Sequence, residues 1–501
     1  MNWKKMRMLA AILTLICGTI VVNTGCGSAD SGNADRKALD IHTEDDISGL
    51  SVAALTGSVY DFELSARDDV TLYRYSTTAD CIEALRSGKV DAYLDDEISV
   101  SPTEMKRHNM RIAFKKDDYY DVGFAFRKQD APLVAEFNKY LAAAKQSGLF
   151  EEMNHRWFDT DSPDRESIPP LPEINEGEVL RVGTITTNAP ITFLRGKDWQ
   201  GYEAEVVKRF AQYLGRPIEI KLYDTAAAPA ALQTGIIDLW MGCIFITEER
   251  QKSMAFSDSH YACHPAYYIL DSETAEGHGL FSWEGLKDSF YSNLVYEDRW
   301  MFIVDGLKET IVISLWSLLL GTLLGCIVCW MRMCRFRWIN GIAKCYIELL
   351  RGIPLLVFLM IMYYLVLATS GLSATMIAVL AFSMVFAAYT SEMFRTAVEG
   401  VSHGQTEAGI ALGFTPLQTF LFIVAPQAIR SVMPVYKGEA VSLFKNTSIV
   451  GYIAIQDLTK ASDLIRSRTF DAFFPLIIVT IIYFILAWLL GLLLDLAAKK
   501  A

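Results

Sequence analysis

The sequence has little charge and no catalytic motif. Only 21% of its 501 residues are charged, and the formal net charge is -12. Because a nucleic-acid partner requires a basic surface, this acidic balance argues against one. No G-x-x-x-x-G-K-[ST] phosphate loop occurs, and the seven histidines are scattered without a nucleophile motif. These absences argue against ATP hydrolysis by this chain and against a soluble enzyme.

The nine cysteines do not show the spacing of a metal site. Cys81, Cys243 and Cys263 fall in the two mixed blocks described below. For Cys243 and Cys263 two interpretations stay open, a disulfide or two buried free thiols. We expect no cofactor and no bound metal.

Hydrophobic residues make up 52% of the chain, which is high for a wholly soluble protein. The length suggests about three domains. Residues 311–331 carry no charge and can span ~30 Å of hydrocarbon. Residues 352–391 are also uncharged and predict two spans with a turn near residues 369–373. A fourth predicted span is interrupted by charged residues. Residues 472–494 predict a fifth span that is not interrupted.

Residues 1–26 begin with basic residues, continue as an apolar run and end at Cys26. This layout is typical of a secretory signal. The Gly-Cys pair at its end resembles a bacterial lipoprotein cleavage site, although Asn23 replaces the usual leucine. A lipidated Cys26 and an uncleaved anchor both stay open. Residues 27–40 are small and polar and predict a tether to an exported domain.

Two blocks, residues 41–158 and 179–272, alternate strand and helix patterns, which predicts sheets with helices on their faces. The proline-rich, charged residues 159–178 between them predict a linker. We expect strands at residues 50–55, 89–94, 122–127, 179–185, 218–223 and 236–242, and helices at residues 80–87, 133–158, 201–215 and 226–234.

Residues 404–426 read GQTEAGIALGFTPLQTFLFIVAP. This segment resembles the cytoplasmic coupling loop of ABC importer membrane subunits, whose signature is Glu-Ala-Ala, three residues, Gly, nine residues, Ile, one residue and Leu-Pro. The matching residues are Glu407, Ala408, Gly413, Ile423 and Pro426, whereas Gly409 and Ala425 depart from the signature. Segments 347–364, 387–395 and 437–462 resemble the polar amino acid branch of these permeases, and the likeness covers roughly residues 300–496.

This resemblance implies a type I importer permease domain at residues 306–496, all α with five transmembrane helices, preceded by a connector at 273–305. Its coupling loop at 403–426 would turn at Gly413 and begin a second short helix at Pro416. The implied partners are a separate cytoplasmic ABC ATPase subunit, membrane lipid and a second copy of the chain.

Basic residues in the first loop and at the C-terminus agree with cytoplasmic positions. The implied location is the bacterial inner membrane, with the binding domain outside the cytoplasm. The external loop at residues 457–471 is an exception, because it carries Lys460, Arg466 and Arg468.

The two blocks resemble one amino acid binding protein, an α/β two-lobed domain of the periplasmic-binding-protein type II class, in permuted order. Residues 179–272 resemble the start of lobe one. Residues 41 to about 120 resemble lobe two, and residues 122–158 resemble the segment that returns to lobe one. The linker would join the old termini. Two truncated, separate domains are the alternative.

The same resemblance implies a ligand site. Arg250, in the Thr247–Arg250 motif, would clamp an α-carboxylate, Asp96 would receive an α-ammonium, and Ser58 would offer a hydroxyl or an amide. The alternative roles are a helix cap for Arg250 and a solvated surface charge for Asp96. Three positions depart from the family: Ile185, the stretch Asn188-Ala189-Pro190-Ile191, and Phe245.

The sequence thus predicts the substrate-binding and permease component of an ATP-driven importer of polar amino acids, a transporter subunit rather than an enzyme. Two alternatives stay open. One is an ABC importer of a different small solute. The other is a binding-domain receptor without transport, although such a receptor would not need a coupling loop.

Overall fold

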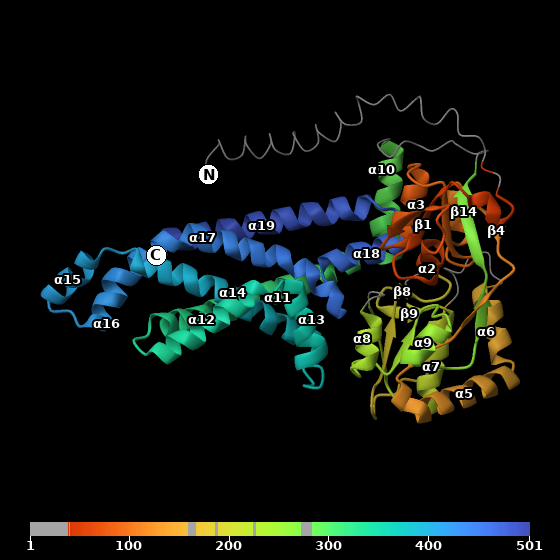
Figure 1. Cartoon of the computed structure of the whole chain (residues 1–501), viewed down its shortest axis with the longest axis horizontal. Coiled ribbons are helices and arrows are strands. Elements are labelled where there is room, and N and C mark those ends of the chain that lie inside the picture. Colours follow the sequence, from red (N-terminus) through yellow and green to blue (C-terminus); the bar gives the residue numbers. More distant parts are fainter. Residues whose placement is uncertain are drawn as a thin grey trace.

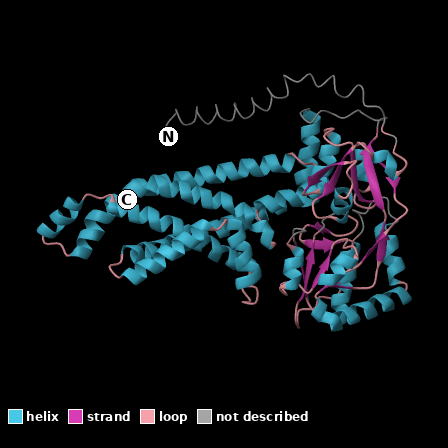
Figure 2. Ribbon diagram, in the orientation of Figure 1, coloured by secondary structure: helices cyan, strands magenta, loops and turns pink. Residues whose placement is uncertain are grey.

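Figure 1 shows the computed structural model, which describes residues 39, 41–158, 167–185, 189–223, 227–271 and 283–500. An α/β domain lies at one end of an elongated bundle of helices (Figures 1 and 2). The predicted signal at residues 1–26, with Cys26, lies outside the described residues, as do most of the tether and part of the linker.

Lobe two contains a five-stranded sheet in the order β2-β1-β3-β14-β4. Strand β1 is parallel to both β2 and β3, whereas β14 is antiparallel to β3 and β4. The strands are β1 (Ser51–Leu55), β2 (Thr71–Tyr75), β3 (Ala92–Asp96), β4 (Met110–Lys115) and β14 (Pro265–Leu270), and the helices are a 3-10 turn (Glu44–Ile47), α2 (Val59–Ser65), α3 (Thr78–Arg86) and α4 (Pro102–Arg107).

Lobe one contains a second five-stranded sheet in the order β10-β7-β11-β6-β12. Its strands are β6 (Ala125–Phe126), β7 (Leu180–Thr184), β10 (Ile218–Leu222), β11 (Leu239–Met241) and β12 (Ala255–Phe256), with a hairpin of β8 (Phe193–Arg195) and β9 (Asp198–Gln200). Its helices are α5 (Ala131–Gln146), α6 (Leu149–Phe158), α7 (Tyr202–Leu214), α8 (Ala228–Gln233) and α9 (Glu248–Ser253).

The two blocks of sequence exchange strands. Strand β6 comes from the first block and lies in the sheet of lobe one, between β11 and β12. Strand β14 comes from the second block and lies in the sheet of lobe two, between β3 and β4. We expected β14 in lobe one, but the chain crosses earlier, through β13 (Tyr261–Cys263), which pairs with β5 (Tyr120–Val122). Each sheet is therefore completed by a strand from the other block.

Local sequence explains where α7 begins and ends. Buried side chains at residues 202, 206, 207 and 210 repeat at helical spacing and pack into the core of lobe one. The helix stops at Gly215, which has a φ of 64° and closes the last turn in the left-handed conformation. The predicted helix at residues 201–215 is confirmed, and the predicted helix at 133–158 is divided into α5 and α6 at Gly148.

The helical bundle contains four described helices that are long and apolar enough to cross a membrane. They are α11 (Trp300–Met333), α14 (Ala374–Glu399), the stretch Pro416–Ile453 that contains α17 (Ala425–Asn446), and α19, apolar over Phe474–Leu496. They correspond to the predicted first, third, fourth and fifth spans.

The predicted second span has a different form. Helix α12 (Arg337–Gly352) is followed by α13 (Leu355–Ile361) and a π-helical turn to Val366, and the two parts are bent by 107°. Pro354 lies at the bend, where a proline lacks the amide hydrogen that would continue the helix. The bent pair makes a fifth crossing only if both parts are counted as one span.

Helix α18 (Leu458–Thr469) lies where the sequence predicted an external loop. Asp457 caps it, because its carboxylate accepts hydrogen bonds from the backbone amides of Thr459 and Lys460 at 3.0 Å. Figure 1 shows α18 at the end of the bundle that faces the α/β domain. The short helices α15 (His403–Ala411) and α16 (Pro416–Thr419) lie at the opposite end.

Candidate ligand-binding and coupling sites

Asp96 is the last residue of β3, and its side chain is buried between the two lobes. The Tyr60 hydroxyl donates to Oδ1 of Asp96, and the Cys243 thiol lies 3.2 Å from Oδ2. Burial, and then the charge of neighbouring Asp95, raises the pKa of Asp96 from 3.8 to about 7. Asp96 is thus not a solvated surface charge, which was the alternative role considered for it.

Phe245 lies against Tyr60, whose hydroxyl donates to Asp96. Its ring stacks on Tyr120 at 4.9 Å between centroids and meets Tyr60 edge-on at 5.9 Å. Tyr60 belongs to α2 of lobe two, whereas Phe245 follows β11 of lobe one. These rings belong to a core shared by both lobes, so the lobes are in contact here. The family departure at Phe245 therefore places an aromatic ring where the resemblance predicts a hydroxyl.

Arg250 lies in the first turn of α9, next to Phe245. Its Nη1 donates to the Phe245 carbonyl at 3.2 Å, and its backbone amide donates to the Thr247 hydroxyl at 3.3 Å. Thr247, rather than Arg250, caps the helix. Burial lowers the pKa of Arg250, and no ion pair involves its guanidinium among the residues that the structure describes. A partly buried cation without an acidic partner can receive an anion.

Ser58 lies at the start of α2 and caps that helix. Its hydroxyl accepts a hydrogen bond from the Asp61 amide at 3.1 Å, and its own amide donates to the Leu55 carbonyl at 3.1 Å. The sequence predicts that Ser58 offers either its hydroxyl or its amide to a ligand. Because the amide already donates to Leu55, only the hydroxyl has a hydrogen free for a ligand. Asp96 thus contacts Tyr60 and Arg250 contacts Phe245, whereas Ser58 and Thr247 cap the helices α2 and α9.

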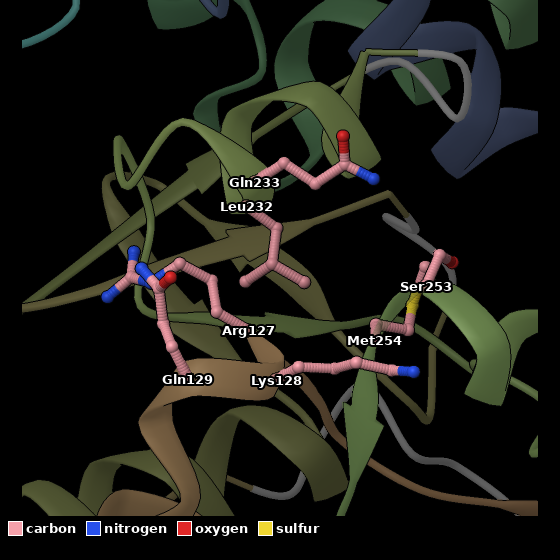
Figure 3. Close-up of a pocket in the computed structure, with 7 residues that line it drawn as sticks. All are labelled: Arg127, Lys128, Gln129, Leu232, Gln233, Ser253 and Met254. Atoms are coloured by element: carbon pink, nitrogen blue, oxygen red, sulfur yellow. The ribbon is translucent and has the colours of Figure 1, made fainter.

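A small hollow on lobe one is lined by none of these four residues (Figure 3). Its lining residues are Arg127, Lys128, Gln129, Leu232, Gln233, Ser253 and Met254. The Arg127 guanidinium donates to the Ile237 carbonyl at 2.8 Å and pairs with Asp130 and Asp238. Because its only arginine has three structural partners, this hollow is a poor candidate for ligand binding.

The predicted coupling loop is a helix, a tight turn and a second short helix. Gly413 follows α15 with a φ of 90°, a backbone conformation that side chains disfavour. Pro416 lies in the first turn of α16, as predicted. Thr415 and Gln418 form a capping box, in which each side chain accepts from the backbone amide of the other, at 3.3 and 2.9 Å.

Gly409 departs from the Glu-Ala-Ala signature, and the local packing explains the departure. A Cβ atom at this position would lie 2.7 Å from Cγ2 of Thr419 and 2.9 Å from Cδ1 of Ile423. Both residues follow the turn, so the two arms of the loop approach each other closely at Gly409. An alanine here requires the arms to separate.

The tip of the loop is apolar and uncovered. Leu412 is 77% exposed, Leu417 66% and Phe422 68%. Ile410, Phe420 and Leu421 add further exposed apolar surface. A contiguous apolar patch on a protruding loop is typical of a surface that another protein covers.

Comparison with known proteins identifies the helical bundle. Residues 317–501 match the family described as "Binding-protein-dependent transport system inner membrane component". The chain is 33% identical over 202 residues to "L-cystine transport system permease protein TcyB" of Bacillus subtilis (strain 168), covering 40% of this chain and 86% of that protein. The chain belongs to this family of inner membrane transport components.

Other relatives agree with this assignment of the permease domain. "Glutamate/aspartate import permease protein GltK" of Escherichia coli O6:H1 is 30% identical over 222 residues, covering 41% of this chain and 99% of that protein. A solved structure described as an amino acid ABC transporter with histidines is 32% identical, covers 40% of this chain and 94% of its own, and has a TM-score of 0.37. The family match and the two permease relatives confirm the resemblance that the sequence shows to ABC importer permeases.

The permease domain contacts both lobes through α18 and its neighbours. Arg466 pairs with Asp80 of lobe two, and Arg468 donates to the Leu194 carbonyl of lobe one at 3.1 Å. Leu464 packs against Leu194 and other apolar residues of lobe one. Of the basic residues that departed from the expected charge pattern, Arg466 and Arg468 therefore have partners in the α/β domain, and Arg468 also pairs with Glu297 in the connector before α11.

Sequence reasoning missed three groups of the site. Tyr60 and Cys243 hold Asp96, and Tyr120 covers Phe245, yet none belongs to the quoted motifs. The sequence feature that could have indicated them was Phe245 itself, because a large ring at a position that carries a small polar residue in the family must displace neighbouring groups. Only the three-dimensional contact between lobes shows what it meets.

Proposed function

We propose that the chain is the substrate-binding and permease component of an ATP-driven importer of polar amino acids. One observation carries the proposal. The α/β domain lies at one end of the permease bundle, and the coupling loop lies at the opposite end (Figure 1). A membrane around the bundle would separate a ligand-binding domain outside from an ATPase-docking loop inside.

The ligand side is supported by the charges between the lobes. Arg250 is a partly buried cation for a carboxylate, Asp96 is a buried acid for an ammonium group, and the Ser58 hydroxyl at the start of α2 can donate to the ligand. A zwitterionic amino acid carries both complementary charges. Opening the lobes and moving the Phe245 ring would give it access.

The proposed docking of an ATPase is supported by the exposed apolar tip of the coupling loop. Glu407 and Ala408 are exposed on α15, and the turn at Gly413 projects the tip from the bundle. We propose that a separate ABC ATPase subunit covers this tip and that two copies of the chain share one translocation path. The chain is then a transporter subunit and hydrolyses no ATP itself.

The order of the two blocks supports a circularly permuted binding domain of the type II class. Helix α6 ends at Phe158 and β7 starts at Leu180, and both belong to the core of lobe one. The described part of the segment between them, residues 167–179, contacts this lobe, where the Ile168 amide donates to Gln200 at 2.8 Å. A linker that joins two ends of one lobe is what permutation requires.

The location follows from the same arrangement. We propose a multi-pass protein of the bacterial inner membrane with the α/β domain outside, exported by residues 1–26 and held either by that segment or by lipid on Cys26. Arg466 and Arg468 agree with an external α18, because their partners are acidic or carbonyl groups at the α/β end of the bundle.

Phe245 favours one alternative, an importer of a different small solute. The ring fills part of the site next to Asp96, so a ligand smaller than a polar amino acid, or one with an aromatic preference, is the second candidate. A receptor that binds ligand without transport is the third, and it gives no role to the coupling loop.

The decisive experiment uses the full chain with its ATPase partner in proteoliposomes. We expect ATP-dependent uptake of a labelled polar amino acid that a thermal-shift screen of the full chain has identified, since a tight ligand raises the melting temperature. Uptake of another solute would select the second candidate. Ligand binding without ATP-dependent uptake would select the receptor.

A further inference from the structure

Three potential metal ligands meet between the lobes. They are the Asp96 carboxylate and the thiols of Cys243 and Cys263, whose ligand atoms all lie within 4.8 Å of one another. Asp96 ends β3 of lobe two, Cys243 follows β11 of lobe one, and Cys263 ends the crossing strand β13. The cluster is assembled only when the lobes meet, because its members come from both of them.

The distances fit one tetrahedral ion. The two sulfurs are 3.9 Å apart, and the Cys243 sulfur is 3.2 Å from Oδ2 of Asp96. For a zinc ion with Zn–S of about 2.3 Å and Zn–O of about 2.0 Å, tetrahedral angles place the sulfurs about 3.8 Å apart and sulfur and oxygen about 3.5 Å apart. Small side-chain shifts therefore suffice to place an ion between the three groups.

Neighbouring groups orient two of the three ligands. Tyr60 donates to Oδ1 of Asp96, which leaves Oδ2 directed to the sulfur of Cys243. The buried Glu203 carboxylate accepts from the backbone amides of Gly242 and Cys243 at 2.7 and 3.1 Å, and thereby holds the turn in which Cys243 has a φ of 57°. Such partners fix ligand direction in metal sites.

We propose that Asp96, Cys243 and Cys263 form a site for a thiophilic metal cation of the zinc class, which ties the two lobes together. Two sulfur ligands favour zinc or a softer ion, whereas calcium and magnesium prefer oxygen ligands. A water or hydroxyl completes the fourth position. The ion would take the place next to Asp96 that the importer proposal gives to an ammonium group, so the two would compete for this carboxylate.

The test is a titration of the reduced full chain in detergent with Co²⁺ and no amino acid, followed by displacement with Zn²⁺. We expect one equivalent of Co²⁺ to produce thiolate-to-metal charge-transfer absorption and tetrahedral ligand-field bands. Cys243→Ser and Cys263→Ser should each abolish this spectrum, and Asp96→Asn should lower the affinity at least tenfold. The control Cys345→Ser, at an exposed position in the permease domain, should leave it unchanged.

A second measurement uses the parent protein only, because a variant of the buried Cys263 can fail to fold. Zn²⁺ should slow alkylation of Cys243 and Cys263 at least tenfold, and a chelator should reverse the protection, while Cys345 reacts equally in both states. Equal alkylation with and without Zn²⁺, or recovery of the pair as a disulfide from protein purified without reductant, would overturn the proposal. Neither result bears on uptake, so the importer proposal is tested separately.

Discussion

The turn of the coupling loop allows a matched test of the proposed contact between the permease domain and a separate ATPase subunit. Gly413 has a φ of 90°, and a Cβ atom built there meets no atom within 4 Å. A substitution is therefore opposed by backbone strain alone and not by a clash. We expect Gly413→Ala to cost about 1–3 kcal/mol locally, which corresponds to about a 5- to 150-fold loss of ATPase affinity if docking needs the turn.

The control is Gly404→Ala. Gly404 lies in α15, is exposed, has no positive φ, and would bring a Cβ atom no closer than 3.6 Å to a neighbouring side chain. The assay pairs ligand affinity of the full chain with ligand-stimulated ATPase activity in lipid. We expect unchanged ligand affinity in both variants and a loss of stimulation only in Gly413→Ala. Equal stimulation in the two variants would refute the role assigned to the turn.

Three further predictions concern single side chains. Arg250→Ala should weaken binding of the identified amino acid by at least ~2 kcal/mol in calorimetry, because it removes a buried charge partner, while the exposed control Arg107→Ala should not. The pKa of Asp96 is raised from 3.8 to about 7, so the folded chain retains a proton that the unfolded chain releases, and its stability should fall as pH rises between about 4 and 7. Asp96→Asn removes this loss, so the melting temperature of the variant minus that of the parent should increase as pH rises from about 4 to about 7. A difference that stays constant over this range would contradict the burial of Asp96. Gly409→Ala should impair ATPase stimulation through its clash with Thr419, and adding Thr419→Ser should restore part of it; no rescue would show that the close approach is unimportant.

Sequence patterns predicted the elements whose signals are local. The apolar periodicity and terminal glycine of residues 201–215 correspond to α7, and the apolar runs correspond to α11, α14 and α19. The turn at Gly413 followed from a motif whose chemistry is fixed by backbone conformation. Such features depend on a few consecutive residues, so a single sequence suffices for them.

Features that depend on distant partners were missed or misplaced. Helix α18 has charged residues that favour a solvated loop, and its Arg466 is buried only because Asp80 lies opposite. Strand β14 was not among the predicted strands, and no local feature of residues 265–270 tells which sheet they join. The contacts of Asp96 with Tyr60 and Cys243 join residues 36 and 147 positions apart. Residue spacing carries no signal for such pairs.

The exchange of β6 and β14 sets an order of events for the chain as it is made and, under the location that we propose, exported. The sheet of lobe two lacks the strand between β3 and β4 until residues 265–270 have arrived, so residues 41–120 are made well before they can close their core. Domains generally fold as units during synthesis, the N-terminal one first. Here the first block must wait for the second, and the strand that completes it is the last of the α/β domain before the membrane helices. Folding outside and insertion of the first span are thus joined through one six-residue strand.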